Sequence, residues 1–227
     1  MAGPFMYASP EQVMKDKADY ARKGVARGKP IAALEYADGI VFVAENPSAT
    51  LHKISEIYDR IAFAGVGKHN EYENLRVLGI RQAEMKGYAY ARDDVNARSL
   101  ANLYSQVLGQ VFTDQLKPFE VEILVAGVGP SNGACTMYRV NYAGEMIDEH
   151  GFAALGGQEE LTRQLHERYR EGASLADAVR AGSESLQAVG SKEIPSGQLE
   201  IAVLDRTLSR RKFRRLPSDE VERLRSG

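Results

Sequence analysis

The order in which helical and strand-like segments follow one another restricts the fold of this chain more than any other feature of its sequence. Helical periodicity and short apolar runs predict a helix, four strands, two helices, three or more strands, two helices, two strands and a short last helix. Units of the βαβ type would alternate single strands with single helices, whereas helices here come in pairs. The order therefore predicts an α+β fold of two stacked, mainly antiparallel sheets with helix pairs on their outer faces.

No stretch of the chain has the composition of a linker and no internal repeat occurs, so we expect one domain over residues 1–227. The expected strands are short apolar runs, at residues 31–36, 40–45, 53–57, 61–66, 120–128, 134–141, 145–149, 199–204 and 212–216. The second expected helix covers residues 70–86, and the third runs from a cap at Asp93 or Asp94 to Lys117-Pro118. Two more helices are expected to begin at Gly156-Gly157 and at Ser174. A C-terminal helix is expected at 217–224.

The first helix is predicted over residues 10–27. Ser9 is a suitable N-cap, Pro10 suits the first helical position and Gln12 is placed to complete a capping box. Gly28 and Pro30 end the helix. One face of this helix is basic, which would suit a membrane surface, but the opposite face is built mainly of Ala, Met and Val. We therefore expect it to pack against a partner subunit.

The overall charge excludes several classes of partner. A net charge of −2 and a pI near 6.1 give no reason to expect nucleic acid or an anionic membrane as a ligand. The basic segment 206–215 favours a solvated hairpin over a nucleic-acid patch, because Phe213 is its only aromatic residue. Cys135 is the only cysteine, which favours a reducing, cytoplasmic location. No apolar run approaches the roughly 20 residues that span a bilayer, and no signal peptide is recognisable.

The sequence contains neither a complete phosphate-binding loop nor a recognisable metal-binding motif. The run Gly65-Val66-Gly67-Lys68 follows a strand and precedes a helix, but a phosphate-binding loop needs Gly at position 62 and Ser or Thr at position 69. Those positions hold Ala62 and His69. The four histidines show no metal-ligand spacing and are expected to be surface or hydrogen-bonded residues. We expect no cofactor and no metal.

Several segments taken together resemble proteasome α subunits. They are Ser9-Pro10 with DYARKGV at 19–25, KPIAAL at 29–34, DGIVFVAE at 38–45, Lys53-Ile54 with IAFAG at 61–65, and KPFEV at 117–121. The segments ENPS at 45–48 and EYENL at 71–75 resemble the actinobacterial branch of this family. The resemblance runs from about residue 5 to residue 215. It implies the four-layer αββα sandwich of N-terminal-nucleophile hydrolases. It further implies a ring of seven identical α subunits that caps rings of catalytic β subunits.

The resemblance also assigns roles to residues. It implies an axial gate made by segment 1–8 and the start of the first helix, a pore loop, and a pocket between neighbouring subunits for the C-terminal carboxylate of an AAA ATPase activator. Unfolded or tagged proteins would pass through the pore. The gate residues are Phe5, Met6, Tyr7, Ala8, Ser9, Pro10 and Tyr20; the pore residues are Leu116 and Lys117; the activator-binding residues are Lys53, Gly28 and Gly67. The pore loop is shortened to residues 115–117, and actinobacterial members carry a longer acidic tail.

The chain itself argues against catalysis. In this superfamily the nucleophile is the first residue of the first strand, and its free amine serves as the base. Alignment with β-type subunits puts Lys29 at that position, Glu45 at the catalytic acid and Lys53 at the catalytic lysine. Lys29 offers no hydroxyl, and a helix precedes its amide.

Three alternatives remain open from the sequence. The chain could be a β-type hydrolase processed at Ser48 or Thr50, although either cleavage would delete the first hairpin. It could be an interaction protein with a basic helix, unrelated to proteolysis. Lys53 could also face solvent or pair with Glu45 or Glu56.

Overall fold

The computed structural model describes residues 9–129 and 134–226. Its helices are α1 (Pro10–Ala26), α2 (His69–Ala89), α3 (Ala97–Asp114), α4 (Gln158–Arg168), α5 (Leu175–Gly190) and α6 (Ser218–Ser226), with 3-10 turns η1 (Arg92–Asp94) and η2 (Ser196–Gln198). Its strands are β1 (Ile31–Tyr36), β2 (Gly39–Glu45), β3 (Ile54–Tyr58), β4 (Ile61–Gly67), β5 (Val121–Val128), β6 (Cys135–Val140), β7 (Met146–Glu149), β8 (Phe152–Leu155), β9 (Leu199–Asp205) and β10 (Phe213–Arg215).

Ten strands form two five-stranded sheets within the described residues. The first sheet has the order β10-β9-β2-β1-β8 and the second the order β3-β4-β5-β6-β7. Each pairing of neighbouring strands is antiparallel. The β1–β2 hairpin is buried along almost its whole length, as its apolar sequence predicts for strands covered on both faces. The prediction of two mainly antiparallel sheets is therefore confirmed.

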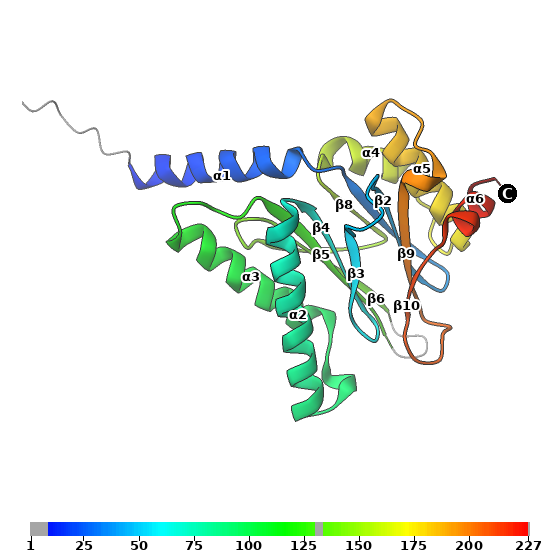
Figure 1. Ribbon diagram of the computed structural model, residues 1–227, viewed down its shortest axis with the longest axis horizontal. Helices are drawn as coiled ribbons and strands as arrows, with labels where there is room; N and C mark the ends of the chain where they lie inside the picture. The colour runs from blue at the N-terminus through cyan, green and yellow to red at the C-terminus, as the bar shows by residue number, and fades with distance from the viewer. Residues whose placement is uncertain (1–8, 130–133, 227) are drawn as a thin grey trace, which may run out of the picture.

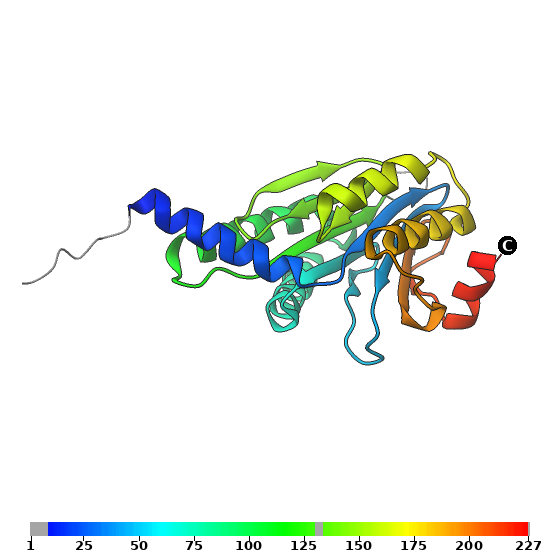
Figure 2. The ribbon, with the colours of Figure 1, turned by 90° about the horizontal axis from the view of Figure 1, so that it is seen from above.

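Two helix layers and two sheet layers stack on one another (Figures 1 and 2). Three apolar clusters hold these layers together. The first cluster lies between the two sheets and includes Phe42 and Leu124. The second joins the outer face of the first sheet to α4 and α5, and the third joins the outer face of the second sheet to α2 and α3. The largest buried side chain of the third cluster is Tyr104. The chain therefore has the expected four-layer αββα sandwich.

Helix α1 projects from one end of the sandwich (Figures 1 and 2). The Ser9 hydroxyl accepts a hydrogen bond from the Gln12 backbone N–H at 3.2 Å, which confirms the predicted cap. The Gln12 side chain donates to Asp16 at 2.6 Å, so the expected capping box does not form. Only residues of the second half of the helix are buried, namely Ala21, Gly24 and Val25.

One strand was not among those expected by residue range, and one helix cap differs from the expectation. Strand β8 pairs with β1 and brings the strands between α3 and α4 to four, within the expected three or more. Helix α3 is capped by Asn96, whose side chain accepts from the Ser99 N–H at 2.9 Å, and not by Asp93 or Asp94. Those two residues lie in η1, where Asp93 pairs with Arg60 at 2.6 Å.

Candidate functional site

The residues predicted to bind an activator come together where α1 passes into β1. Lys53, at the start of β3, donates from Nζ to the carbonyl oxygen of Lys29 at 2.6 Å. A β-carbon placed on Gly28 would lie 2.8 Å from the backbone nitrogen of Gly67. Gly67 has φ +108, and a β-carbon there would lie 1.9 Å from the Glu120 carbonyl oxygen. Glycine is therefore required at both positions by close backbone approach, and a positive φ adds to the requirement at Gly67.

The electrostatic surroundings of Lys53 are unusual for a lysine. Its side chain is half-buried, and this burial lowers its pKa to about 8. The carboxylates of Glu200 and Glu45 oppose the shift by attracting the ammonium charge, whereas the Lys29 ammonium reinforces it. At neutral pH Lys53 is thus a cation that donates a hydrogen bond to a neutral carbonyl oxygen.

The carboxylates considered as partners for Lys53 are engaged by other side chains. Glu45 is buried at the end of β2 and receives Lys192 Nζ at 2.6 Å and Lys29 Nζ at 3.5 Å. Burial raises the pKa of Glu45, but the hydrogen bond from Lys192 and the charge of Lys29 outweigh it and hold the pKa below its usual value. Glu56 pairs with Arg211.

A buried carboxylate holds the backbone at Lys53 in place through hydrogen bonds. Glu200 of β9 is 7% exposed and accepts hydrogen bonds from the backbone N–H groups of Lys53 (3.0 Å) and Ile54 (3.1 Å). It also accepts from Asn46 Nδ2 at 2.6 Å and from the Arg215 guanidinium. Sequence reasoning missed this residue. The available signal is a single charged residue within the otherwise apolar run at 199–204.

The positions aligned with a catalytic site also converge here. Lys29 Nζ contacts Glu45, and the Lys29 carbonyl oxygen accepts from Lys53. Lys29 follows α1 in the chain, so its backbone nitrogen belongs to a peptide bond and is not a free amine. Ser48 and Thr50, the alternative nucleophiles, lie between β2 and β3, where Ser48 Oγ accepts from the Thr50 N–H at 3.3 Å. The geometry retains an acid and a lysine beside a residue without a nucleophilic oxygen.

The predicted gate residues are placed only in part. Phe5, Met6, Tyr7 and Ala8 lie outside the described residues. Ser9 caps α1 and Pro10 is its first residue. Tyr20 lies further along the same helix and is 48% exposed. The Tyr20 hydroxyl donates to Glu120 at 3.3 Å.

The two predicted pore residues differ in their exposure to solvent and in their contacts. Leu116 is 98% exposed in the connection from α3 to β5. Lys117 pairs with the buried carboxylates of Glu71 (2.7 Å) and Glu120 (3.1 Å), and its ammonium lies 5.7 Å from the Tyr20 ring centroid. The structure therefore brings Lys117 together with Tyr20 and leaves Leu116 extended into solvent.

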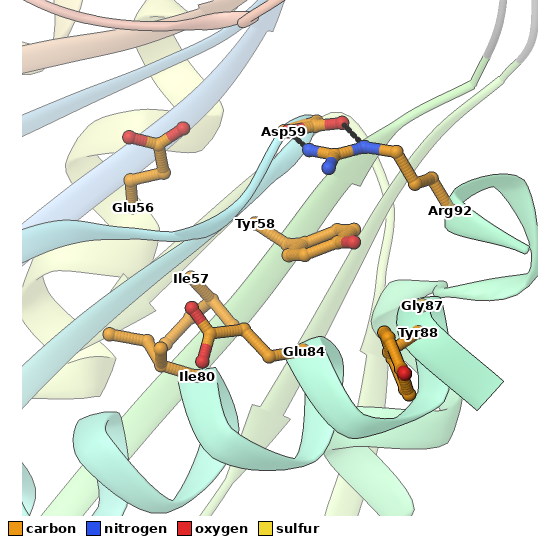
Figure 3. A pocket seen from close by; sticks show the side chains of 9 residues that line it. All are labelled: Glu56, Ile57, Tyr58, Asp59, Ile80, Glu84, Gly87, Tyr88 and Arg92. Atoms are coloured by element: carbon orange, nitrogen blue, oxygen red, sulfur yellow. Dashed lines mark hydrogen bonds and ion pairs between the residues drawn. The ribbon is translucent and has the colours of Figure 1, made fainter.

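A separate hollow of about 680 Å³ lies between the β3–β4 turn and the end of α2 (Figure 3). Arg92 makes two hydrogen bonds to Asp59, at 3.0 and 2.6 Å, and its guanidinium lies 5.0 Å from the Tyr58 ring centroid. Tyr88 stands at the rim and is 95% exposed. None of the predicted site residues lines this hollow, and the contacts of Arg92 hold η1 against the β3–β4 turn.

Two features are absent from residues 9–129 and 134–226, the part of the chain that the structure describes. Within these ranges no group of three or more His, Cys, Asp and Glu side chains is arranged to hold a metal ion. Nor do they contain a helix of the length and apolarity that crossing a membrane requires.

Comparison with known proteins gives a consistent result. A family described as "Proteasome subunit" matches residues 25–204. A protein named "Proteasome subunit alpha" from Streptosporangium roseum is 57% identical, over 99% of this chain and 87% of that protein. Proteins of the same name from Kineococcus radiotolerans and Nocardioides sp. are 53% and 56% identical, over 100% and 99% of this chain and 99% and 89% of their own lengths.

Proposed function

Since this chain belongs to the proteasome subunit family, on its alpha branch, we propose that it is a non-catalytic α-ring subunit of a bacterial proteasome core. In this proposal seven copies form a ring that caps β subunits in the cytoplasm. The ring forms a gated opening for unfolded or tagged proteins and a docking surface for an ATPase ring. The observation that carries the proposal is the convergence of Lys53, Gly28 and Gly67 at one site.

The absence of a nucleophilic oxygen at position 29 supports a non-catalytic role. Glu45 and Lys53 occupy the positions of the catalytic acid and lysine, but Lys29 presents an ammonium that is paired with Glu45. An ammonium at neutral pH can neither attack a peptide carbonyl nor take a proton from a nucleophile. Peptide hydrolysis in the assembled particle is therefore assigned to the β subunits.

The chemistry around Lys53 supports docking of a C-terminal carboxylate. An ammonium beside backbone N–H groups captures a carboxylate through charge-assisted hydrogen bonds. The glycines at 28 and 67 carry no side chain, which lets a peptide terminus approach the backbone. Because Glu45 and Glu56 are engaged by other cations, Lys53 is available to an external anion.

The beginning of the chain supports a gate. Residues 1–8 precede the Ser9 cap in sequence, and α1, which begins at that cap, projects from the sandwich (Figure 1). Tyr20 of α1 and Lys117 meet beside Glu120, and this contact between one predicted gate residue and one predicted pore residue supports the proposal. Seven such segments meeting at an axis could tie one another down.

The docking proposal is tested on particles assembled by co-expression with a β subunit. We expect Lys53→Ala to abolish the stimulation of protein degradation by the ATPase ring, measured as the ratio of rates with and without the activator. Loss of one charged hydrogen bond per site costs on the order of 1.5–3 kcal/mol. Lys86→Ala is the matched control, because Lys86 lies in the last turn of α2 and its ammonium has a weak 3.4 Å contact with the Ser99 hydroxyl. Wild-type stimulation of Lys53→Ala particles would refute the docking site.

A further inference from the structure

Positive charge exceeds negative charge in the side-chain cluster around Lys53. The cluster consists of the ammonium groups of Lys29, Lys53 and Lys192 and the carboxylate of Glu45. Two of the ammoniums share that one carboxylate, and the third donates to a carbonyl oxygen. Three positive charges therefore face one negative charge.

The nearby carboxylate of Glu200 attracts Lys53, but its charge is matched by that of Arg215, so the Glu200–Arg215 pair does not remove the excess. The Glu200 oxygens accept from the Arg215 guanidinium, from the Asn46 amide and from two backbone N–H groups. Glu200 is thus committed to Arg215 and to the backbone at the start of β3. The excess positive charge remains on the side of the cluster that carries the three lysines.

The four members of the cluster differ in their freedom to move. The side chains of Lys29 and Lys192 are 50% and 46% exposed, whereas that of Glu45 is 9% exposed and fixed at the end of β2. Long lysine side chains keep their charged ends in water and can reorient at low cost. An anion arriving at Lys53 therefore meets two mobile ammonium groups that can leave Glu45 and turn towards it.

We propose that Lys29 and Lys192 are additional ligands of the carboxylate that docks at Lys53, and that Glu45 is an internal competitor for those two lysines. This inference rests on the proposed docking role of Lys53. The anion site then contains three lysines. Two of them, Lys29 and Lys192, are paired with Glu45 until the carboxylate of a peptide terminus replaces Glu45 as their partner.

Removing the charge of Glu45 should change peptide binding in opposite directions under the two possible roles of this residue. If Glu45 merely positions the lysines, removing its charge weakens binding. If Glu45 competes, removing its charge releases Lys29 and Lys192 and tightens binding. Half-exposed ion pairs set the scale, so we expect a two- to fivefold effect for each group, with a tighter Kd for Glu45→Gln and a weaker one for Lys29→Gln and Lys192→Gln.

The experiment measures the Kd of a fluorescein-labelled decapeptide, the C-terminal segment of the ATPase subunit, on assembled α/β particles at pH 7.0. Its C-terminally amidated twin reports binding that does not need the carboxylate. Glu56→Gln is the matched control for Glu45→Gln, because Glu56 also pairs with a basic side chain but lies outside the cluster. Lys192→Arg tests rescue of Lys192→Gln by a retained positive charge.

We expect Glu45→Gln to tighten binding of the free-acid peptide and to leave binding of the amidated twin unchanged. Weaker or unchanged binding of the free-acid peptide to Glu45→Gln, or wild-type binding to the double variant Lys29→Gln/Lys192→Gln, would overturn the three-lysine site. The lysine variants decide the matter even if Glu45→Gln fails to assemble, because both side chains are half-exposed. Wild-type binding by Lys53→Gln would instead refute the docking proposal itself, so the two failures are distinguishable.

Discussion

Replacing Glu200 by glutamine should destabilise the chain far more than a typical exchange of a charged residue. The two oxygens of Glu200 each accept from two donors: one from Asn46 Nδ2 and the Lys53 N–H, the other from the Ile54 N–H and Arg215. Glutamine keeps only one acceptor oxygen, so whichever atom becomes NH₂ faces two donors. Two hydrogen bonds are lost, and the negative partner of Arg215 disappears.

The magnitude follows from burial. Glu200 is 7% exposed, and leaving a buried donor unsatisfied costs about 1–3 kcal/mol. Two donors lose their acceptor in this way, and Arg215, whose side chain is 31% exposed, also loses its negative partner. For two such donors we expect a loss of about 2–6 kcal/mol in the free energy of unfolding. For a chain of this length that lowers Tm by roughly 4–24 °C.

Differential scanning calorimetry of the purified chain checks this value. Glu56→Gln is the matched control: Glu56 pairs with Arg211, whose side chain is 67% exposed, so its loss should cost about 0–1 kcal/mol. If the two variants shift Tm by the same small amount, Glu200 does not hold β3 to β9 as described.

Three further predictions concern activity. The chain without β subunits should not hydrolyse a fluorogenic peptide, because Lys29 has no nucleophilic oxygen; turnover blocked by a threonine-directed inhibitor would contradict this, as would an intact mass showing a mature N-terminus at Ser or Thr. Deletion of residues 2–8 should raise peptide hydrolysis by assembled particles, and an unchanged rate with intact assembly would argue against a gate. Stimulation by the ATPase ring should fall as pH rises through about 8, because only the ammonium form of Lys53 binds a carboxylate; a pH profile that stays flat to pH 9.5 would show that Lys53 is not titrating there.

The sequence predicts the architecture because the apolar patterns of most elements are long and local. Helix α3 and the β1–β2 hairpin show clear periodicity or continuous apolar runs, and the structure contains them. Strand β8 was missed because it has four residues and follows a tight turn at Gly151, where φ is +75. So short a run carries no usable periodicity.

The cap of α3 shows a different limit. Asp93, Asp94 and Asn96 are all suitable N-caps, and local preference does not separate them. The choice depends on distant partners: Arg60 binds Asp93, and Asp59 binds Arg92, which holds residues 92–94 in η1. The helix therefore starts after Asn96.

The candidate site was predictable only through resemblance to a family. Lys53, Gly28 and Gly67 are far apart in sequence, and no spacing rule joins them. The contacts of Glu200 with Asn46, Lys53 and Arg215 likewise span both sheets and depend on how the sheets stack. A lone glutamate in an apolar strand marks a buried polar contact but does not say what it holds.

Imaging of particles from co-expression with a β subunit shows whether this chain builds a non-catalytic ring on a proteasome core. We expect a particle of four stacked rings, with this chain in the two outer sevenfold rings and the β subunit in the inner ones. A chain that stays outside the particle, or that occupies the inner rings, would contradict this expectation.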